Sequence, residues 1–380
     1  MYDQVRKYVA KLMGHGLIEG AGDAGLYGLD DEIYTNRDTV PGEVKALFDL
    51  LNINSLLIAR PEPLRWGIIQ ELIRDHPPRI TPCDCESLTF IHDIPVLETF
   101  DIEQTAWALN QRKGCIVRDT GIVSTGSVSL EQTFITMSSI CFSTFVKFFT
   151  DTLNGLHGYA PAARPNADRI DSCLAFLAEL VPATPTHPLS EEIPREPSGI
   201  MEYMDAAGKA LVASSLVDSF FGNISFRQGD LIYISQTGSS LDELPGYIDC
   251  VPMDGSSSCS LTSSSELESH AKIYELTKDT AILHGHPKFS VIMSMYGETL
   301  EFGRTRWIGD VPVVAGEVGS GRRGLVHTLP KAMQESHVAI VSGHGTFAST
   351  PGSFRSAFET ISSIERSCFE RYREALLAGL

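Results

Sequence analysis

The sequence predicts an α/β protein composed of two tandem domains that share one layered architecture. Short apolar and β-branched runs alternate with longer stretches of helical spacing, an internal repeat relates the two halves, and a proline-rich segment separates them. The chain has 380 residues, of which 43% are hydrophobic and 21% are charged. It is therefore long enough to bury two cores and too apolar to be disordered.

The internal repeat is clearest where residues 116–145 align without gaps with residues 340–369. Eleven of these 30 aligned positions are identical, including the pattern F-x-T-x-S-S-I in both segments. The similarity continues upstream with gaps, where residues 57–61 align with residues 283–287. Such self-similarity indicates two copies of one fold.

Residues 156–197 are predicted to be a linker, which leaves residues 1–155 and 198–380 as the two copies. Seven prolines lie between positions 158 and 199, and proline interrupts both helices and central strands. A short apolar stretch at 170–181 predicts one helix within the linker.

The second copy shows the alternation of strands and helices most clearly. Apolar residues at helical spacing predict helices at 201–219, 266–276 and 353–377. Runs rich in β-branched residues predict strands at 231–235, 280–283, 291–295, 311–315 and 339–342.

The acidic composition excludes a protein that binds the phosphate backbone of nucleic acids. The chain has 48 acidic and 30 basic side chains and a net charge of −18, whereas such binding needs a basic face. The N-terminus has no apolar run after its first charges, and no uncharged apolar stretch is long enough to span a membrane. We therefore expect a cytoplasmic protein with no membrane partner, in which the eight scattered cysteines are reduced thiols.

A histidine pair at the end of a predicted strand suggests a metal site. His284 and His286 follow the apolar run 281–283. Residues i and i+2 of a strand point to the same face, so both imidazoles can reach one ion. His344 follows the strand predicted at 339–342, and glycines on both sides let the backbone approach a ligand closely.

A polar segment opens the helix that precedes this histidine pair. It consists of Ser264, Ser265 and Glu266. Helix N-termini favour anions, so the two serines suit a phosphate or an oxyanion. His270 lies one turn after Glu266 on the same face, where it either orients the carboxylate or is a buried structural histidine.

The first copy provides a comparison for the three histidines. At the aligned positions it has Ile58, Arg60 and Thr120. A histidine pair alone is more often a structural or solvent-exposed feature, but histidines that the fold needs for packing should recur in both copies. The contrast favours an active second copy and a first copy kept for assembly or regulation.

Several motifs of the second copy occur together in a specific order and spacing. They are Gly222-Asn223-Ile224-Ser225, Thr237-Gly238, Ser264-Ser265-Glu266-x-x-x-His270-x-x-x-Tyr274, His284-Gly285-His286-Pro287 and His344-Gly345. This set, which spans residues 200–380, resembles the class II aldolase/adducin family, and the first copy resembles it in degenerate form. The family includes fuculose-1-phosphate and rhamnulose-1-phosphate aldolases and ribulose-5-phosphate 4-epimerase. The resemblance implies two tandem α/β/α layered domains, each with a central, largely antiparallel sheet.

The resemblance also implies a role for individual residues. His284, His286 and His344 would bind a divalent metal, usually zinc in this family, and Glu266 would be the catalytic acid/base. The residues expected around a substrate phosphate are Gly222, Asn223, Thr237, Gly238, Ser264 and Ser265. A dication chelated by the hydroxy-keto end of a sugar stabilises the enediolate that forms when a carbon–carbon bond breaks.

We therefore expect a metal-dependent lyase that cleaves or forms an aldol bond in a small hydroxy-keto compound, such as a sugar phosphate. Family aldolases have a glutamate before the H-x-H pair and the 4-epimerase has an aspartate, so Glu266 favours aldol chemistry. One alternative is an epimerase, dehydratase or decarboxylase on the same fold, and another is a non-catalytic, adducin-like scaffold. The retained histidines disfavour the scaffold.

Two features bear on how far the resemblance extends. Phe220 stands two positions before the Gly-Asn pair, where family aldolases have a small polar residue. The family's catalytic tyrosine comes from a neighbouring subunit or from the C-terminal tail, and Tyr296 is a candidate here. Single-copy relatives form four-fold rings, so we expect a homo-oligomer, either two tandem chains in a pseudo-tetramer or a tetramer.

A glycine-rich motif at 319–324 fits G-x-G-x-x-G but lacks the context of a dinucleotide site. Pro330 interrupts the helix that should follow, and Ala339 stands where the acidic residue is needed. We expect a loop there, and Arg322 and Arg323 are candidates for contact with an anionic group of the substrate.

Overall fold

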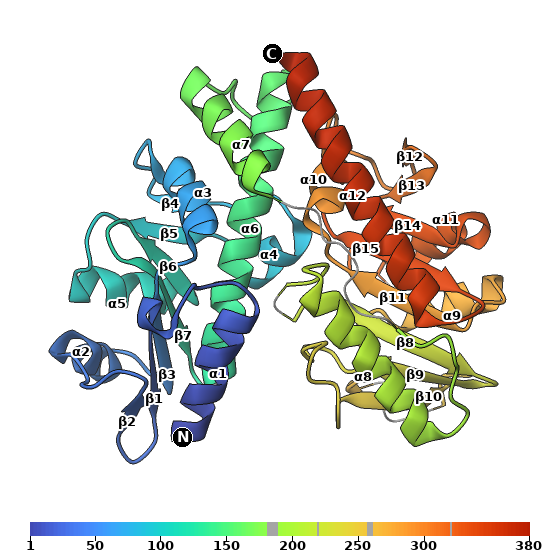
Figure 1. Cartoon of the computed structure of the whole chain (residues 1–380), viewed down its shortest axis with the longest axis horizontal. Coiled ribbons are helices and arrows are strands. Elements are labelled where there is room, and N and C mark those ends of the chain that lie inside the picture. The colour runs from blue at the N-terminus through green and yellow to red at the C-terminus, as the bar shows by residue number, and fades with distance from the viewer. Residues whose placement is uncertain (181–188, 219, 257–260, 320) are drawn as a thin grey trace. The chain divides into compact units, whose positions relative to one another are not determined.

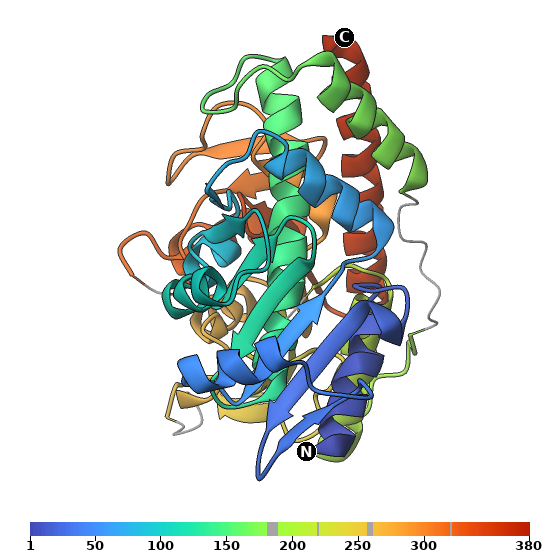
Figure 2. The same cartoon turned by 90° about the vertical axis from the view of Figure 1, so that its left-hand side faces the viewer.

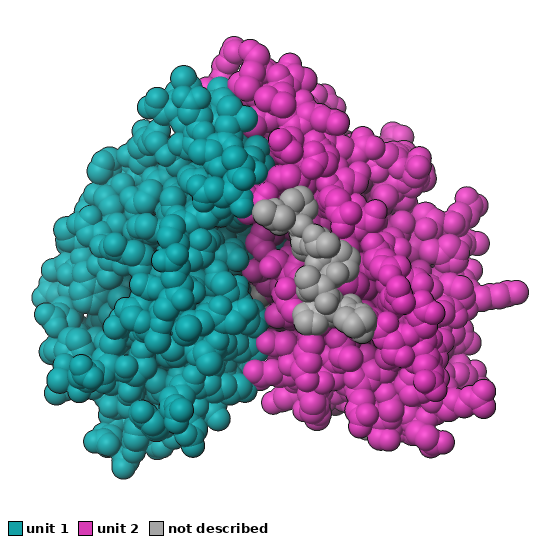
Figure 3. Space-filling view, in the orientation of Figure 1, with its two compact units in different colours: residues 1–149, 166–179 teal, residues 150–165, 180–380 magenta. Residues whose placement is uncertain are grey.

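The computed structural model describes residues 1–180, 189–218, 220–256, 261–319 and 321–380. The predictions for the 181–188 part of the linker, for Ser219, for Cys259 and for Ser320 lie outside the described residues. The chain forms two compact units, which Figure 3 distinguishes by colour. Unit 1 comprises Met1–Phe149 and Asn166–Glu179, and unit 2 comprises Thr150–Pro165 and Leu180–Leu380.

The segment between the two repeats contributes to both units. Helix α7 (Ala167–Glu179) overlaps the helix expected at 170–181 and belongs to unit 1. The chain before it, Thr150–Pro165, belongs to unit 2, so the long helix α6 (Leu130–Leu156) has residues in both.

Unit 1 contains a seven-stranded sheet that is antiparallel except for one pair. Its order is β2 (Ile33–Thr35), β1 (Ala24–Leu29), β3 (Ser55–Ala59), β7 (Gly121–Gly126), β6 (Gly114–Val117), β5 (Ile94–Leu97) and β4 (Arg79–Ile80). The parallel pair is β5 and β6. All other neighbours run antiparallel.

Helices cover both faces of this sheet (Figures 1 and 2). Successive residues of a strand point to opposite faces. Leu57 accordingly enters a core with α1 (Tyr2–Gly14) and α6, whereas Leu56 enters a second core with α2 (Gly42–Leu50) and α5 (Ile102–Gln111). The other helices of unit 1 are α3 (Pro63–Ile73), α4 (Cys85–Phe90), α7 and a 3-10 turn at Ala21–Asp23.

The described part of unit 2 contains an eight-stranded sheet. Its order is β10 (Ile248–Pro252), β9 (Leu231–Ser235), β8 (Asn223–Gln228), β11 (Ala281–Gly285), β15 (Gly345–Thr350), β14 (Val338–Val341), β13 (Val311–Val314) and β12 (Thr305–Ile308). From β9 to β12 the order and directions repeat those of β2 to β4, including the single parallel pair, here β13 and β14. Strand β10 has no counterpart in unit 1, all of whose residues are described.

Helices pack against this second sheet as well. Helices α9 (Leu267–Leu276) and α11 (Leu329–Ser336) enclose a core that includes Ile234, Ile273 and Met333. Helices α8 (Pro197–Ala213), α10 (Lys288–Ser294) and α12 (Phe354–Gly379) contact strands of the same sheet outside this cluster, and a 3-10 turn occupies Leu325–His327. The predicted α/β class with two largely antiparallel sheets is confirmed.

One predicted strand is wrong. Residues 291–295 were expected to be extended, but Lys288–Ser294 form helix α10. All seven residues of α10 are buried, including the polar Lys288, Ser290 and Ser294, so polar and apolar residues do not separate into an exposed and a buried face. A short run that is buried on every side cannot be assigned to strand or helix from its pattern alone.

Helix α6 is long and apolar enough to cross a membrane by length and composition alone. However, 89% of its most apolar window is buried, as in the core helix of a soluble protein. The seven cysteines in the described part of the chain form no disulfides with one another.

Candidate metal centre

Two neighbouring strands bring the three predicted histidine ligands together. His284 lies on β11, which pairs with β8 and β15, and His286 follows directly after the strand. His344 lies in the turn between β14 and β15, after Gly343, whose φ is +67°. Because the end of β11 pairs with the start of β15, side chains 60 residues apart meet at one edge of the sheet.

The three imidazoles converge through their Nε2 atoms. His284 Nε2 lies 3.0 Å from His344 Nε2 and 3.0 Å from His286 Nε2. The three residues are 1%, 2% and 1% exposed, in that order. His284 Nδ1 lies 3.2 Å from the carbonyl oxygen of Thr346. A carbonyl only accepts hydrogen bonds, so the proton of His284 resides on Nδ1 and its Nε2 presents a lone pair to the cluster.

Two buried phenylalanines restrict the orientation of these rings. Phe347 stacks on His284 with ring centroids 3.7 Å apart and an interplanar angle of 6°. Phe221 stacks on His286 with centroids 5.2 Å apart and an angle of 25°. Sequence reasoning assigned neither residue to the site, because stacking partners carry no spacing signal.

Burial keeps the imidazoles of His284 and His286 neutral. Desolvation lowers the pKa of His284 to about 3, although the nearby Glu266 carboxylate opposes this. Desolvation also holds the pKa of His286 well below its usual value, and the neighbouring histidines add to the effect. A neutral imidazole is the form that donates a lone pair to a metal ion.

Glu266 brings a carboxylate to the same cluster. It occupies the N-cap position of α9 and is 3% exposed. Its Oε1 lies 3.3 Å from His344 Nε2 and its Oε2 lies 3.6 Å from His284 Nε2. Asn223 Nδ2 donates a hydrogen bond to Oε2. Burial opposes ionisation of Glu266, but a proton on His284 or His344 and the hydrogen bond from Asn223 favour the carboxylate and hold the pKa of Glu266 below its usual range.

This donor set fits a divalent metal of the zinc class. The ligand atoms of the three histidines lie within 4.8 Å of one another, and nitrogens bound to one tetrahedral zinc at about 2.1 Å are roughly 3.4 Å apart. Three imidazoles with an open position beside them match a catalytic rather than a closed structural site. The carboxylate of Glu266 stands next to that position.

The predicted phosphate-binding residues lie at the start of β8 and on two loops, one after β9 and one before α9. Gly222 has φ of +80°, and Asn223 follows it at the start of β8. Thr237 and Gly238 follow β9, and Ser264 and Ser265 precede α9; Thr237, Gly238 and Ser265 are exposed, whereas Ser264 is buried. The loops pair through the bonds from Thr237 N to Thr262 O and from Ser264 N to Ser235 O, both 3.0 Å long.

His270 belongs to a buried chain of hydrogen bonds rather than to the carboxylate. Its Nδ1 lies 2.7 Å from Ser225 Oγ, which lies 2.7 Å from the hydroxyl of Tyr274. Among the described hydrogen bonds, the only one between His270 and Glu266 runs from the main-chain His270 N to Glu266 O. Of the two expected roles, the buried structural histidine agrees with these contacts.

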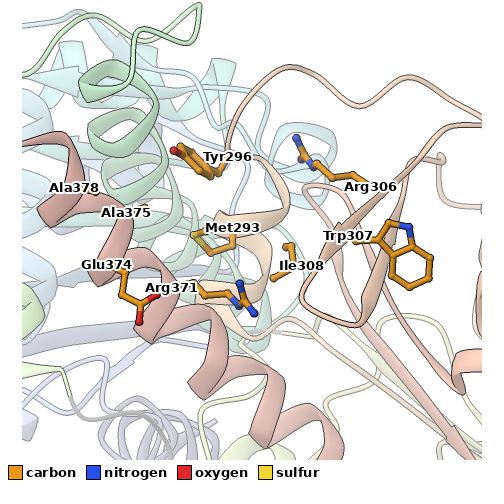
Figure 4. Close-up of a pocket in the computed structure, with 9 residues that line it drawn as sticks. All are labelled: Met293, Tyr296, Arg306, Trp307, Ile308, Arg371, Glu374, Ala375 and Ala378. Carbon is orange, nitrogen blue, oxygen red and sulfur yellow. The ribbon is translucent and has the colours of Figure 1, made fainter.

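Tyr296 lies in a separate cavity of unit 2. The cavity has a volume of about 400 Å³ and is lined by Met293, Tyr296, Arg306, Trp307, Ile308, Arg371, Glu374, Ala375 and Ala378 (Figure 4). None of the three histidines or Glu266 is among these lining residues. Edge-on contacts of Tyr296 with His157 and Tyr159 fix its ring. The described contacts therefore give no support to Tyr296 as the proton donor.

The other singled-out residues lie apart from the histidines in the described contacts. Phe220 is half-buried, and its ring packs against that of Phe221. Arg322 and Arg323 are exposed. Arg323 Nε lies 3.9 Å from Glu317 Oε1, and the guanidinium lies over the ring of Phe302. These are the contacts of a side chain at the surface.

Strand register confirms which residues of unit 1 are equivalent to the histidines. Ile58 pairs with Val123 in the β3–β7 pair, as His284 pairs with Phe347 in the β11–β15 pair. Arg60 Nη2 donates to the carbonyl oxygen of Asp119 at 2.6 Å. Unit 1 thus has an apolar strand position and a backbone-bound guanidinium where unit 2 has two imidazoles.

With this geometry described, comparison with known proteins identifies the class of unit 2. Residues 202–372 match the family model of the Class II Aldolase and Adducin N-terminal domain. This segment of the chain belongs to that family, and the resemblance inferred from the motifs is confirmed. No curated protein matches the chain.

Solved structures that are similar to this chain each correspond to less than half of it. The l-fuculose-1-phosphate aldolase from Thermus thermophilus is 23% identical, with a TM-score of 0.41, and covers 47% of this chain and 95% of its own. YgbL from Klebsiella pneumoniae is 21% identical, with a TM-score of 0.38, and the match covers 45% of this chain and 87% of YgbL. A sugar-phosphate aldolase from Thermotoga maritima is 15% identical, with a TM-score of 0.34, and the match covers 47% of this chain and 96% of the aldolase.

Proposed function

We propose that unit 2 is a metal-dependent lyase that cleaves or forms an aldol bond in a small hydroxy-keto compound. The observation that carries this proposal is the cluster of three buried Nε2 atoms with the Glu266 carboxylate beside it. Membership of the class II aldolase and adducin family supports it.

Each residue of the cluster has a distinct task in this proposal. His284, His286 and His344 would hold a divalent cation, for which zinc fits best, and this cation would stabilise negative charge that develops on the substrate oxygens. Glu266 takes and returns the proton that moves during bond cleavage. Asn223 orients Glu266 through its hydrogen bond to Oε2. The exposed Thr237, Gly238 and Ser265 would bind an anionic end of the substrate, such as a phosphate.

A second reaction class uses the same charge stabilisation. An epimerase, dehydratase or decarboxylase needs a cation at the substrate oxygens and a carboxylate that moves a proton, and this site has both groups. The glutamate at position 266 favours aldol chemistry, because the family's 4-epimerase has an aspartate there. Activity on a panel of substrates separates the two classes.

The proposal is tested by metal analysis together with an activity screen. We expect wild type to bind one zinc ion per chain, and we expect the double variant His284→Ala/His286→Ala to lose it, because two of the three ligand atoms are removed. His327→Ala, at an exposed histidine of the same unit, is the matched control and should retain zinc.

The second arm of this experiment addresses Glu266. Glu266→Gln should keep the metal and lose at least 100-fold in turnover of ketose phosphates or their unphosphorylated analogues, since general acid–base groups contribute roughly 10²–10⁴-fold. Unchanged zinc content in the double histidine variant contradicts the metal site. Full activity of Glu266→Gln contradicts the assigned proton transfer.

A further inference from the structure

We propose that Asp249 is a positioning residue that fixes the two anion-binding loops and Glu266 relative to one another. This inference rests on the function proposed above. Asp249 lies on β10 and is 8% exposed. Its strand is the one that unit 2 has in addition to the strand order shared by both units.

Three side chains donate hydrogen bonds to the carboxylate of Asp249. Gln236 Nε2 donates to Oδ1 at 2.8 Å. Thr262 Oγ1 donates to Oδ2 at 2.6 Å, and Ser263 Oγ donates to the same oxygen at 2.8 Å. Hydrogen bonds to a carboxylate are shorter and stronger than those between neutral groups. A single buried side chain thus bonds to two segments that are separated in sequence.

The two segments carry the groups that the proposed function uses. Gln236 immediately precedes Thr237 and Gly238, while Thr262 and Ser263 immediately precede Ser264, Ser265 and Glu266. Main-chain pairing joins them through an antiparallel bridge between Gln236 and Ser263. The carboxylate bonds to the side chains of those same bridge residues, so it fixes how far apart and at what angle the two loops present their donors.

Comparison of the two units supports a role in the site rather than in the sheet. Unit 1 builds a sheet with the same strand order and directions but without an equivalent of β10. Its strand β2 is therefore an edge strand, whereas β9 is covered by β10. The extra strand and its carboxylate occur in the unit that has the histidine cluster, which indicates that the fold itself does not require them.

Because Asp249 is charged, the two roles it could have predict opposite changes in anion binding when its charge is removed. A carboxylate near an anion-binding loop repels the anion, so if charge were its main effect, neutralising it would strengthen anion binding. If Asp249 acts by positioning the loops, neutralising it weakens anion binding, because the amide of asparagine cannot accept from all three donors.

The experiment compares Asp249→Asn with the matched control Asp254→Asn. Asp254 is exposed in the turn after the same strand and bonds only locally, to the amide of Ser256, among its described contacts. Inorganic phosphate is titrated calorimetrically into the zinc-loaded full chain, and zinc content and amide hydrogen exchange at 235–239 and 262–266 are measured on the same samples.

We expect Asp249→Asn to retain zinc, to bind phosphate at least tenfold more weakly, and to exchange faster in the two loops but not in β11. Asp254→Asn should match wild type in all three measurements. Thr262→Val removes one of the three donors to Asp249 and should weaken phosphate binding by about threefold. This variant replaces Asp249→Asn in the test if Asp249→Asn does not fold.

Equal or tighter phosphate binding by Asp249→Asn overturns the positioning role. If wild type binds zinc but no phosphate, the phosphate-binding part of the proposed function fails, and hydrogen exchange alone decides the role of Asp249. Faster exchange confined to the two loops then supports it, and unchanged or uniformly faster exchange contradicts it.

Discussion

At the scale of single residues, Gly222 shows how closely the backbone packs against the strand that carries His284. Its φ is +80°, and a Cβ at this position would lie 2.5 Å from the carbonyl oxygen of His284. Both the backbone conformation and the close approach therefore require glycine. Gly238, in the predicted anion-binding loop, has φ of +71° but open space around the position of a Cβ.

We expect Gly222→Ala to lower the free energy of unfolding by at least 3 kcal/mol, because about 1 kcal/mol of backbone strain adds to a clash that displaces His284. Gly238→Ala introduces the same backbone strain but no steric clash. It should lower the free energy of unfolding by only about 1 kcal/mol. Urea unfolding and zinc content of both variants measure the difference. Equal stability of the two variants contradicts the close approach at Gly222.

At the scale of elements, helix α10 illustrates how a tertiary contact decides a local conformation. Glu365 of α12 accepts hydrogen bonds from Phe289 N at 2.9 Å and from Ser290 N at 2.8 Å, which satisfies two amides of the first turn. Lys288 forms a buried ion pair with Asp218 at the same end. These partners are 70 or more residues away in sequence, so no local pattern predicts the helix.

Helix α4 carries a cap that should make the stability of unit 1 depend on pH. Asp84, 1% exposed, accepts a hydrogen bond from Ser87 N at 2.8 Å. Burial raises the pKa of Asp84 from 3.8 to about 6, although this bond opposes the rise. An acid whose pKa is higher in the folded state destabilises the fold when it is ionised. The cost is absent below about pH 4, grows up to about pH 6 and is constant above.

We therefore expect Asp84→Asn, which keeps a capping oxygen, to gain stability relative to wild type as the pH rises from 4 to 7. The gain is on the order of 3 kcal/mol, the free energy that corresponds to the pKa change. Urea unfolding midpoints of both proteins at pH 4, 5, 6 and 7 check this. A stability difference that does not vary with pH contradicts it.

At the scale of the whole molecule, the two units share a strand order and differ in their side chains. The described part of the chain has a single histidine cluster, which lies in unit 2. Both sheets place a turn before their last long strand at the same edge, yet Thr120 occupies that turn in unit 1 and His344 occupies it in unit 2. We propose that unit 1 serves assembly or regulation, that the chain forms a homo-oligomer, and that it acts in the cytoplasm.

We expect light scattering to give at least twice the mass of one chain, because two tandem chains supply the four aldolase-like units of a pseudo-tetramer. The measurement should be repeated with the His284→Ala/His286→Ala variant, whose oligomeric mass should be unchanged if assembly does not depend on the metal site. A monomeric mass for wild type contradicts the proposed assembly.

The sequence by itself determined the repeat, the α/β class and the histidines and glutamate of the candidate metal centre. Each of these depends on chemistry that is visible in the residue order: glycine-flanked histidines at strand ends, a glutamate that opens a helix, and a matching segment that lacks all three histidines. The convergence of these side chains could be anticipated because strand ends meet at a sheet edge.

Only the tertiary structure decided the residues that act through contacts distant in sequence. Phe221 and Phe347 stack on the imidazoles, Asp249 bonds to two loops, and Glu365 caps α10, but none of them belongs to a spacing pattern. Their roles depend on which side chains meet after the sheet has formed, and that pairing is set by long-range packing rather than by local sequence. The same reason explains why 291–295 was assigned to a strand: a run that is buried on every side looks alike in either conformation.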